Sequence, residues 1–314
     1  MKIVVTGSAG HLARALIPRL LREPDVDAVI GIDHAEHDFA DPRFHPVRVD
    51  VRSTEIDRYL DGADALIHMA FVLMGGRLGR ARHRRETVRS VNIEGSRNVF
   101  TRAQAAGVPR LLFVSSASVY GAWPDNPPLM DERQPLRAMS GFAYAEDKVA
   151  VEQWLDDFAA AHPQTAILRL RPHVILGPHA HPLLKTLLRQ PFYPRLGRPA
   201  LTQCVWEDDV ADAIARALRQ GAPGAYNLAA DGAMSFRDMI RLTHRHALPL
   251  PLGLAALAHR LAWWLLPEVG EPGWVQGMQH HLAVDSSRAR AELGWSPRFS
   301  LSECILKIAG PRHV

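Results

Sequence analysis

The feature that most constrains this chain is its first turn, which connects an apolar segment at residues 2–6 to an amphipathic segment at 11–22. The first segment is typical of a buried strand and the second of a helix. Gly7 and Gly10 stand between them, so the backbone can turn tightly and approach a ligand closely. A helix that begins there presents N–H groups and a positive dipole end to an anion. We therefore expect a pyrophosphate site, made by Gly7, Ala9, Gly10, His11 and Leu12.

Asp33 ends the second expected strand, twenty residues beyond Ala13. A carboxylate at this place accepts hydrogen bonds from ribose hydroxyls and repels a 2′-phosphate, so it favours NAD over NADP. Asp50 and Val51 close the third expected strand, where an adenine edge would lie. An ordinary turn role for Asp50 is equally open.

The first half of the chain alternates apolar runs with helical patterns. We expect strands at 2–6, 27–33, 47–51, 65–69, 111–115 and 166–170, with helices at 11–22, 87–107 and 143–162. Such alternation requires crossover connections and predicts an α/β fold, a Rossmann doubly wound parallel sheet.

The regularity weakens after Pro172, where prolines are frequent. We expect a smaller, discontinuous C-terminal substrate-binding lobe beside the sheet. The predicted division is an NAD-binding domain at 1–172, joined by about 201–228, and a substrate-binding lobe at 173–200 and 229–314.

Tyr144 and Lys148 are four residues apart in an expected helix and therefore share a face. A nearby ammonium is expected to lower the pKa of the tyrosine, which suits it to exchange a proton with an alcohol or ketone. The preceding strand ends in a serine cluster that includes Ser116. The carboxyl ends of strands are where open α/β sheets bind ligands.

The order of these motifs resembles the NAD-dependent epimerase/dehydratase family of extended short-chain dehydrogenases. The resemblance rests on Thr-Gly-x-x-Gly-x-x-Ala at residue 6, Asn92, Ser-Ser-Ala-Ser-Val-Tyr-Gly at residue 115, and Tyr-x-x-x-Lys at residue 144. Later segments agree, namely Arg171-Pro172 before Gly177-Pro178, Glu207-Asp-Asp-Val-Ala, and Glu292-Leu-Gly-Trp.

The resemblance implies roles for single residues. Ser116 would hydrogen-bond the substrate oxygen, Tyr144 would be the acid/base, and Lys148 would bind the nicotinamide ribose. Asn92 would support them from the neighbouring helix and contact the cofactor. Tyr144 and Lys148 are also cofactor contacts, together with Met69, Ala70, Phe71, Val114, Pro172 and Val174. The family further implies a homodimer through the helices at 87–107 and 143–162.

The chain departs from the family at three places. Ala117 and Ser118 stand where the dehydratases carry Asp-Glu, which disfavours dehydration because the leaving hydroxyl lacks its proton donor. Val174 stands where the nucleotide-sugar epimerases have Asn. Thr202, and Trp274 or Val275, stand where those enzymes hold the diphosphate with arginines.

Two further segments have open roles. The apolar helix expected at 252–266 is either an ordinary core or dimer helix or a wall of the substrate cleft. The segment from Arg77 to Arg89 contains six arginines and is either a solvated helix face or an anion site.

These observations favour an NAD-dependent oxidoreductase that transfers hydride reversibly at a secondary alcohol or ketone carbon. Its substrate is expected not to be a standard nucleotide sugar and to be hydrophobic, as in the 3β-hydroxysteroid dehydrogenases. The alternative is a nucleotide-sugar epimerase similar to UDP-glucose 4-epimerase with tightly held NAD. A third possibility, an NAD sensor without activity, conflicts with the intact Ser, Tyr and Lys.

Composition excludes several other classes. A net charge of +4 is too small to indicate nucleic-acid binding, and two cysteines and scattered histidines predict no metal site. No segment reads as a membrane span or a signal peptide, so a cytoplasmic location is expected.

Overall fold

The structure is a computed structural model that describes residues 1–37, 39–74, 84–180, 188, 192–195, 199–243, 248–265, 271 and 277–310. Within these ranges every helix is too short or too polar to span a bilayer.

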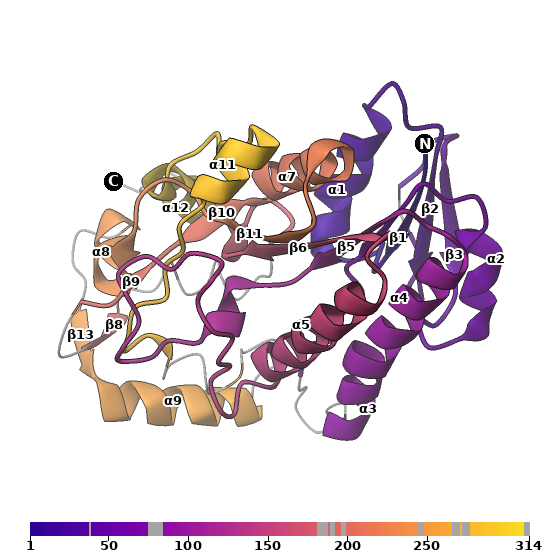
Figure 1. Ribbon diagram of the computed structural model, residues 1–314. Coiled ribbons are helices and arrows are strands. Elements are labelled where there is room, and N and C mark those ends of the chain that lie inside the picture. Colours follow the sequence, from indigo (N-terminus) through magenta and orange to yellow (C-terminus); the bar gives the residue numbers. More distant parts are fainter. Residues whose placement is uncertain are drawn as a thin grey trace.

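The centre of the molecule is a seven-stranded parallel sheet in the order β11-β6-β5-β4-β1-β2-β3 (Figure 1). Its strands are β1 (Lys2–Thr6), β2 (Ala28–Asp33), β3 (Phe44–Arg48), β4 (Ala65–His68), β5 (Arg110–Val114), β6 (Ala166–Pro172) and β11 (Gly224–Leu228). The strand order reverses direction between β1 and β4, which opens a crevice at their carboxyl ends. The doubly wound Rossmann sheet predicted from the sequence is confirmed.

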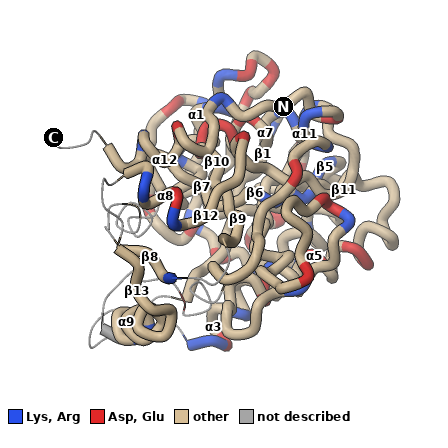
Figure 2. Tube along the Cα trace, turned by 90° about the vertical axis from the view of Figure 1, so that its left-hand side faces the viewer, with Lys and Arg blue, Asp and Glu red and all other residues tan. Residues whose placement is uncertain are grey.

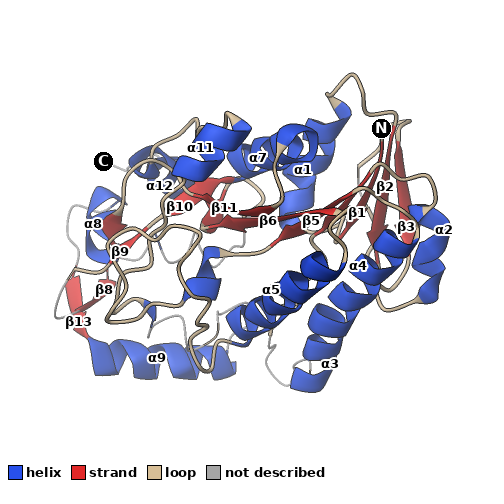
Figure 3. Ribbon diagram, viewed as in Figure 1, coloured by secondary structure: helices blue, strands red, loops and turns tan. Residues whose placement is uncertain are grey.

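Helices cover both faces of the sheet (Figure 3). One layer consists of α1 (His11–Leu21), α7 (Glu207–Gln220) and α11 (Ser287–Leu293). The other consists of α2 (Asp57–Leu60), α3 (Arg85–Arg89), α4 (Gly95–Ala105) and α5 (Ala143–Ala161). Leu16 and Ile214 belong to the core on the first face, and Phe100 and Leu155 to the core on the second.

The Gly-Trp motif near the C-terminus stabilises the helix layer formed by α1, α7 and α11. Trp295 is fully buried, and its indole Nε1 donates to the carbonyl oxygen of Asp209 at 2.8 Å. This bond ties the two late sequence motifs to each other through the core.

Short elements lie beyond the sheet's β11 side. The strand pairs are β7 (Val174–Leu176) with β10 (Cys204–Trp206), β9 (Leu201–Thr202) with β12 (Met234–Ser235), and β8 (Phe192–Arg195) with β13 (Leu248–Pro251). The helices are α8 (Phe236–Thr243), α9 (Leu252–Leu265) and α12 (Leu301–Ala309), and single turns form η1 (Thr54–Ile56), η2 (Ser90–Glu94) and η3 (Ala117–Tyr120).

Two local predictions need correction, and one helix was missed. The third strand covers Phe44–Arg48 rather than 47–51, and it contains Pro46. An edge strand tolerates a proline because its outer side makes no ladder bonds, and β3 is an edge. The helix expected at 87–107 is interrupted by the π-helical turn η2. Helix α12 was not predicted, although Ser300 and Glu303 form a capping box at its start.

Candidate active site and cofactor groove

The glycine loop is built to lie close to the sheet. Gly7 has φ +74°, and a Cβ at this position would lie 2.6 Å from the amide nitrogen of Ala70. Gly10 precedes α1 and provides no side-chain cap, and the first turn of α1 contains no acidic residue. The positive end of α1 therefore has no neutralising carboxylate of its own. This cradle fits a pyrophosphate.

Asp33 lies beside this loop at the end of β2. One carboxylate oxygen accepts from the Ala9 amide at 3.0 Å, and the other accepts from the amides of His34 and Ala35. These bonds hold the carboxylate against the glycine loop, where a ribose next to the pyrophosphate would meet it.

Asp50 and Val51 lie further along the sheet edge. Arg52 pairs with Asp50 at 2.6 Å, and its guanidinium lowers the pKa of that carboxyl. Val51 is buried against Gly95, where a Cβ would lie 2.8 Å from the Val51 Cγ2 atom. Asp50 thus stabilises a turn in the structure, and its role toward adenine remains a prediction.

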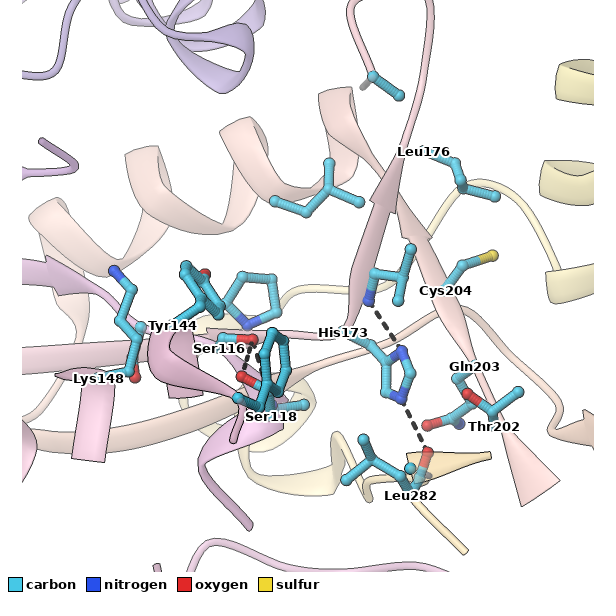
Figure 4. Close-up of a pocket in the computed structure, with 18 of the residues that line it drawn as sticks. Ser116, Ser118, Tyr144, Lys148, His173, Leu176, Thr202, Gln203, Cys204 and Leu282 are labelled. Atoms are coloured by element: carbon cyan, nitrogen blue, oxygen red, sulfur yellow. Dashed lines mark hydrogen bonds between the residues drawn. The ribbon is translucent and has the colours of Figure 1, made fainter. Parts of the chain in front are cut away.

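A cavity of about 830 Å³ extends from the glycine loop past β5 and α5 to the short strands. Figure 4 shows residues that line it, from Lys148 and Tyr144 to Leu176 and Cys204. The predicted site residues that line it are Gly7, Gly10, His11, Leu12, Met69, Phe71, Val114, Ser116, Tyr144, Lys148, Pro172 and Val174. Its described lining does not include Ala9, Asp33, Asp50, Val51, Ala70 or Asn92. The structure therefore gathers the predicted catalytic trio and most of the predicted groove around one cavity.

Ser116 and Tyr144 both line this cavity and lie close enough for Ser116 to influence the pKa of the phenol. The Ser116 oxygen accepts from the Ser118 hydroxyl at 2.9 Å, so it has a fixed orientation (Figure 4). Ser116 acts to lower the pKa of Tyr144, but burial is the larger effect and raises it to about 12. The phenol is neutral at pH 7 in this arrangement.

Lys148 lies behind Tyr144. Its ammonium donates to the Val114 carbonyl at 2.7 Å and lies 3.7 Å from the centre of the Phe71 ring. Burial lowers the pKa of Lys148 to about 7, against the opposing effect of Glu152 and Asp147. The expectation that this ammonium lowers the pKa of Tyr144 is reversed, because burial of the phenol dominates.

Asn92 lies in the π-helical turn η2 and is fully buried. Its amide nitrogen donates to the Val72 carbonyl and to Asp147, and its oxygen accepts from the Val72 amide at 2.7 Å. Asn92 therefore fixes the chain just after β4 and contacts α5 one residue before Lys148. Widened helical turns of this kind are frequent at functional sites.

A buried ion pair supports the site from behind, and sequence analysis missed it. Arg171 pairs with Glu152 at 2.5 Å, and the Ser115 hydroxyl donates to the same carboxylate. Glu152 lies one helical turn after Lys148 and acts to raise its pKa. The four-residue spacing from Lys148 to Glu152 could have indicated this residue.

Glu271 is a second residue that sequence analysis missed. It is buried, lines the cavity, and accepts from the amides of Ala143 at 2.8 Å and Tyr144 at 3.4 Å. The residue that precedes α5, Phe142, makes no capping bond. A carboxylate distant in the sequence thus caps the helix that carries Tyr144, and no local pattern marks it.

The far end of the cavity is mostly apolar, although Thr202 and Glu207 also line the cavity. Two polar side chains there already bond to backbone groups: His173 bridges the Val174 amide and the Leu282 carbonyl, and Gln203 bonds to Gly232 and Val284. Burial lowers the pKa of His173 to about 4, so its ring is neutral. The apolar lining comprises Val174, Leu176, Leu188, Phe236, Met239, Leu282 and Ile305.

The residues at which the chain departs from the family do not all lie at the cavity. Val174 and Thr202 line the cavity, whereas Trp274 and Val275 lie outside the described residues. No described residue of α9 lines it, so the predicted role of 252–266 as a substrate wall is not supported.

The arginine segment 77–89 is described only from Arg84 onward. Within that part, Arg85 pairs with Asp147 at 2.6 Å. An anion site in this segment remains a prediction.

Comparisons with known proteins agree with this geometry. The model of the NAD-dependent epimerase/dehydratase family matches residues 3–229. An uncharacterized protein of Mycobacterium tuberculosis is 27% identical over 312 residues, which cover 96% of this chain and 82% of that protein. A UDP-glucose 4-epimerase of Mycolicibacterium smegmatis is 25% identical over 334 residues, which cover 98% of this chain and 97% of that enzyme.

A solved structure shares the fold. The dTDP-glucose 4,6-dehydratase DesIV of Streptomyces venezuelae, crystallised with NAD, superposes with a TM-score of 0.74 at 23% identity, covering 98% of this chain and 96% of that one. The family model spans the glycine loop, the serine cluster and the Tyr144–Lys148 pair. The chain therefore belongs to the NAD-dependent epimerase/dehydratase family, and NAD is its cofactor.

Proposed function

We propose that this enzyme is an oxidoreductase that transfers hydride reversibly at a secondary alcohol or ketone carbon of a substrate with a large apolar body. The 3β-hydroxysteroid dehydrogenases are the chemical parallel. A standard nucleotide sugar is not the proposed substrate.

The composition of the cavity lining carries this proposal. Among the described residues that line the cavity, no arginine is present and the only lysine is Lys148. Two carboxylates, Glu207 and Glu271, face the same space. A diphosphate that enters a partly buried cleft needs cationic donors to replace its hydration, and these carboxylates would repel it. An apolar body meets no such penalty.

The catalytic residues support hydride transfer in either direction. NAD supplies the hydride acceptor, or as NADH the donor, when it is bound. Ser116 would hold the substrate oxygen through a hydrogen bond. Because the pKa of Tyr144 is about 12, the neutral phenol is suited to protonate the oxygen of a ketone as the carbonyl carbon receives hydride. Protonation of the ketone would leave Tyr144 as a phenolate, and in the oxidative direction this phenolate would take up the hydroxyl proton of the alcohol.

The experiment is a turnover assay at 340 nm with NADH and a panel of ketones whose apolar bodies increase in size. We expect kcat/KM to rise with apolar size and Tyr144→Phe to abolish turnover while NAD binding persists. Calorimetry with uridine- and guanosine-diphosphate sugars on the NAD-loaded enzyme is the counter-test. Micromolar binding of any such sugar would overturn the proposal.

A second candidate is a nucleotide-sugar epimerase. The full-length match to a UDP-glucose 4-epimerase favours it. An epimerase regenerates its own NAD, so conversion of a nucleotide sugar without net NADH formation would establish this candidate instead.

We also propose a homodimer that pairs α4 and α5 with their symmetry mates, by analogy with relatives. Light scattering at micromolar concentration tests it, and a strictly monomeric mass would remove it. A cytoplasmic location is proposed as well.

A further inference from the structure

One corner of the molecule exposes apolar side chains that the enzyme's cavity does not use. We call β8, β13 and α9 the β8–α9 unit. Nine large hydrophobic side chains are exposed among the described residues, and five of them belong to this unit. They are Phe192, Leu248, Leu254, Leu257 and Leu261.

Three of these leucines form a stripe along α9. Leu254, Leu257 and Leu261 are spaced by three and four residues, so they share one helix face, and each is more than half exposed (58%, 54% and 53%). Helix α9 contacts β8 and β13. The stripe therefore points away from the protein, at the corner where both views place α9 (Figures 1 and 2).

The sequence segments that contain this unit carry basic residues and no acidic ones. Residues 177–206 and 239–267, which contain the whole unit, include none of the 33 Asp and Glu residues of the protein. The same segments contain seven basic residues: Lys185, Arg189, Arg195, Arg198, Arg241, Arg245 and Arg260. Figure 2 shows no red along β8, β13 and α9, whereas red segments are spread over the remaining trace.

Two of these arginines belong to the β8–α9 unit itself. Arg260 lies on α9 one residue before Leu261, and its side chain is exposed. Arg195 is exposed at the end of β8 and pairs in register with Pro251, the residue that precedes α9. An apolar stripe flanked by arginines and free of carboxylates is complementary to a surface that is apolar inside and anionic outside.

We propose that the β8–α9 unit docks this enzyme on an anionic lipid bilayer. Helix α9 lies in the plane of the interface, with its three leucines among the upper acyl chains and Arg195 and Arg260 at the lipid phosphates. Its 14 residues amount to about 21 Å, shorter than the ~30 Å hydrocarbon core, so the helix lies on the bilayer. A second copy of this chain fits the surface less well, because it would bring arginines against arginines.

The test is co-sedimentation of the full-length enzyme with sucrose-loaded vesicles. One vesicle is pure phosphatidylcholine and the other contains 30% phosphatidylglycerol. We expect binding to the anionic vesicle, with an affinity that falls as salt rises from 50 to 300 mM. The triple variant Leu254→Gln/Leu257→Gln/Leu261→Gln should bind at least tenfold more weakly. Arg260→Gln should weaken anionic binding about fivefold and reduce the salt dependence.

The matched control is Leu129→Gln/Leu306→Gln, which removes two exposed leucines from other parts of the surface. This variant should bind vesicles as the wild type does. NAD binding and thermal unfolding of every variant establish that it is folded. The assay needs no substrate, so its outcome does not depend on the proposed reaction.

Absence of sedimentation with anionic vesicles at 50 mM salt would overturn the proposal. Equal binding by the triple variant and the wild type would overturn it as well. A wild-type oligomer that dissociates in the triple variant, without any vesicle binding, would assign the stripe to a second copy.

Discussion

Removal of the Glu271 carboxylate should disturb the start of the catalytic helix. Tyr144 is the second residue of α5, in the turn where a helix frays most readily. Phe142 offers no cap, and Glu271 accepts from the amides of Ala143 and Tyr144. In Glu271→Ala these amides lose their acceptor while they remain inside the protein. The variant therefore tests whether a distant carboxylate positions Tyr144.

The magnitude follows from the lost cap. Loss of a helix cap costs about 0.5–2 kcal/mol, and the better bond, at 2.8 Å, is to the buried Ala143 amide, so we expect about 1–2 kcal/mol. A protein of 314 residues unfolds with an entropy near 0.7 kcal/mol/K, so Tm should fall by about 2–3 °C. A small displacement of a catalytic group has a larger effect on rate, so kcat should fall roughly tenfold or more.

The assay compares Glu271→Ala with Glu271→Gln and with Glu86→Ala, an exposed glutamate on α3. Glutamine keeps an acceptor and should restore most of Tm and kcat, whereas Glu86→Ala should change neither. Burial raises the pKa of Glu271, so its ionised form opposes folding increasingly as pH rises from the unfolded pKa through the folded one. The glutamine variant should thus gain stability relative to wild type across that window. Wild-type Tm and kcat in Glu271→Ala would refute the role of Glu271 as a cap.

Three further predictions concern the cofactor end of the site. Gly7→Val should weaken NAD binding at least tenfold by fluorescence titration, because its Cβ would lie 2.6 Å from the Ala70 nitrogen; unchanged affinity would contradict the close approach. Wild type should prefer NAD to NADP, and Asp33→Ser should reduce that preference; equal affinities in wild type would show that Asp33 does not face the ribose. Lys148→Met should abolish turnover yet stabilise the fold, because burial lowers the pKa of Lys148 to about 7. The free energy of unfolding of the wild type should then rise between pH 7 and about 10.5, whereas that of the variant should not. If the free energies of unfolding of the two proteins change in parallel from pH 6 to 10, this prediction is wrong.

The sheet could be predicted because each of its buried strands is indicated by a short stretch of the sequence. Strands β1, β4 and β5 are buried on both faces, and a strand of that kind is a continuous apolar run in the sequence. Strand β3 was misplaced because an edge strand is half exposed, and Phe44 is its only buried residue. The five short strand segments of β7 to β10 and β12 have only two to four residues each, too few for a periodic signal.

That Tyr144 and Lys148 lie on one side of a helix could be predicted for the same reason, since they are spaced by one helical turn, and both line the cavity together with Ser116. Glu271 could not, because it reaches α5 only through the tertiary fold. The pKa of Tyr144 is raised where the sequence predicted that it is lowered, and this difference has a related cause. The helical spacing predicts that an ammonium is near, but it contains no information on how deeply the phenol is buried, and burial is the larger effect here.

The apolar cavity and the β8–α9 unit lead to one joint prediction. A substrate with a large apolar body partitions into bilayers, so an enzyme that docks on them meets it at a raised local concentration. Anionic vesicles should therefore increase the apparent kcat/KM of the wild type for an apolar ketone. They should not do so for the triple leucine variant, whose kcat/KM for a small soluble ketone should remain unchanged because α9 does not line the described cavity. If vesicles lower the rate equally in both proteins, they merely sequester the substrate, and the docking surface does not serve its delivery.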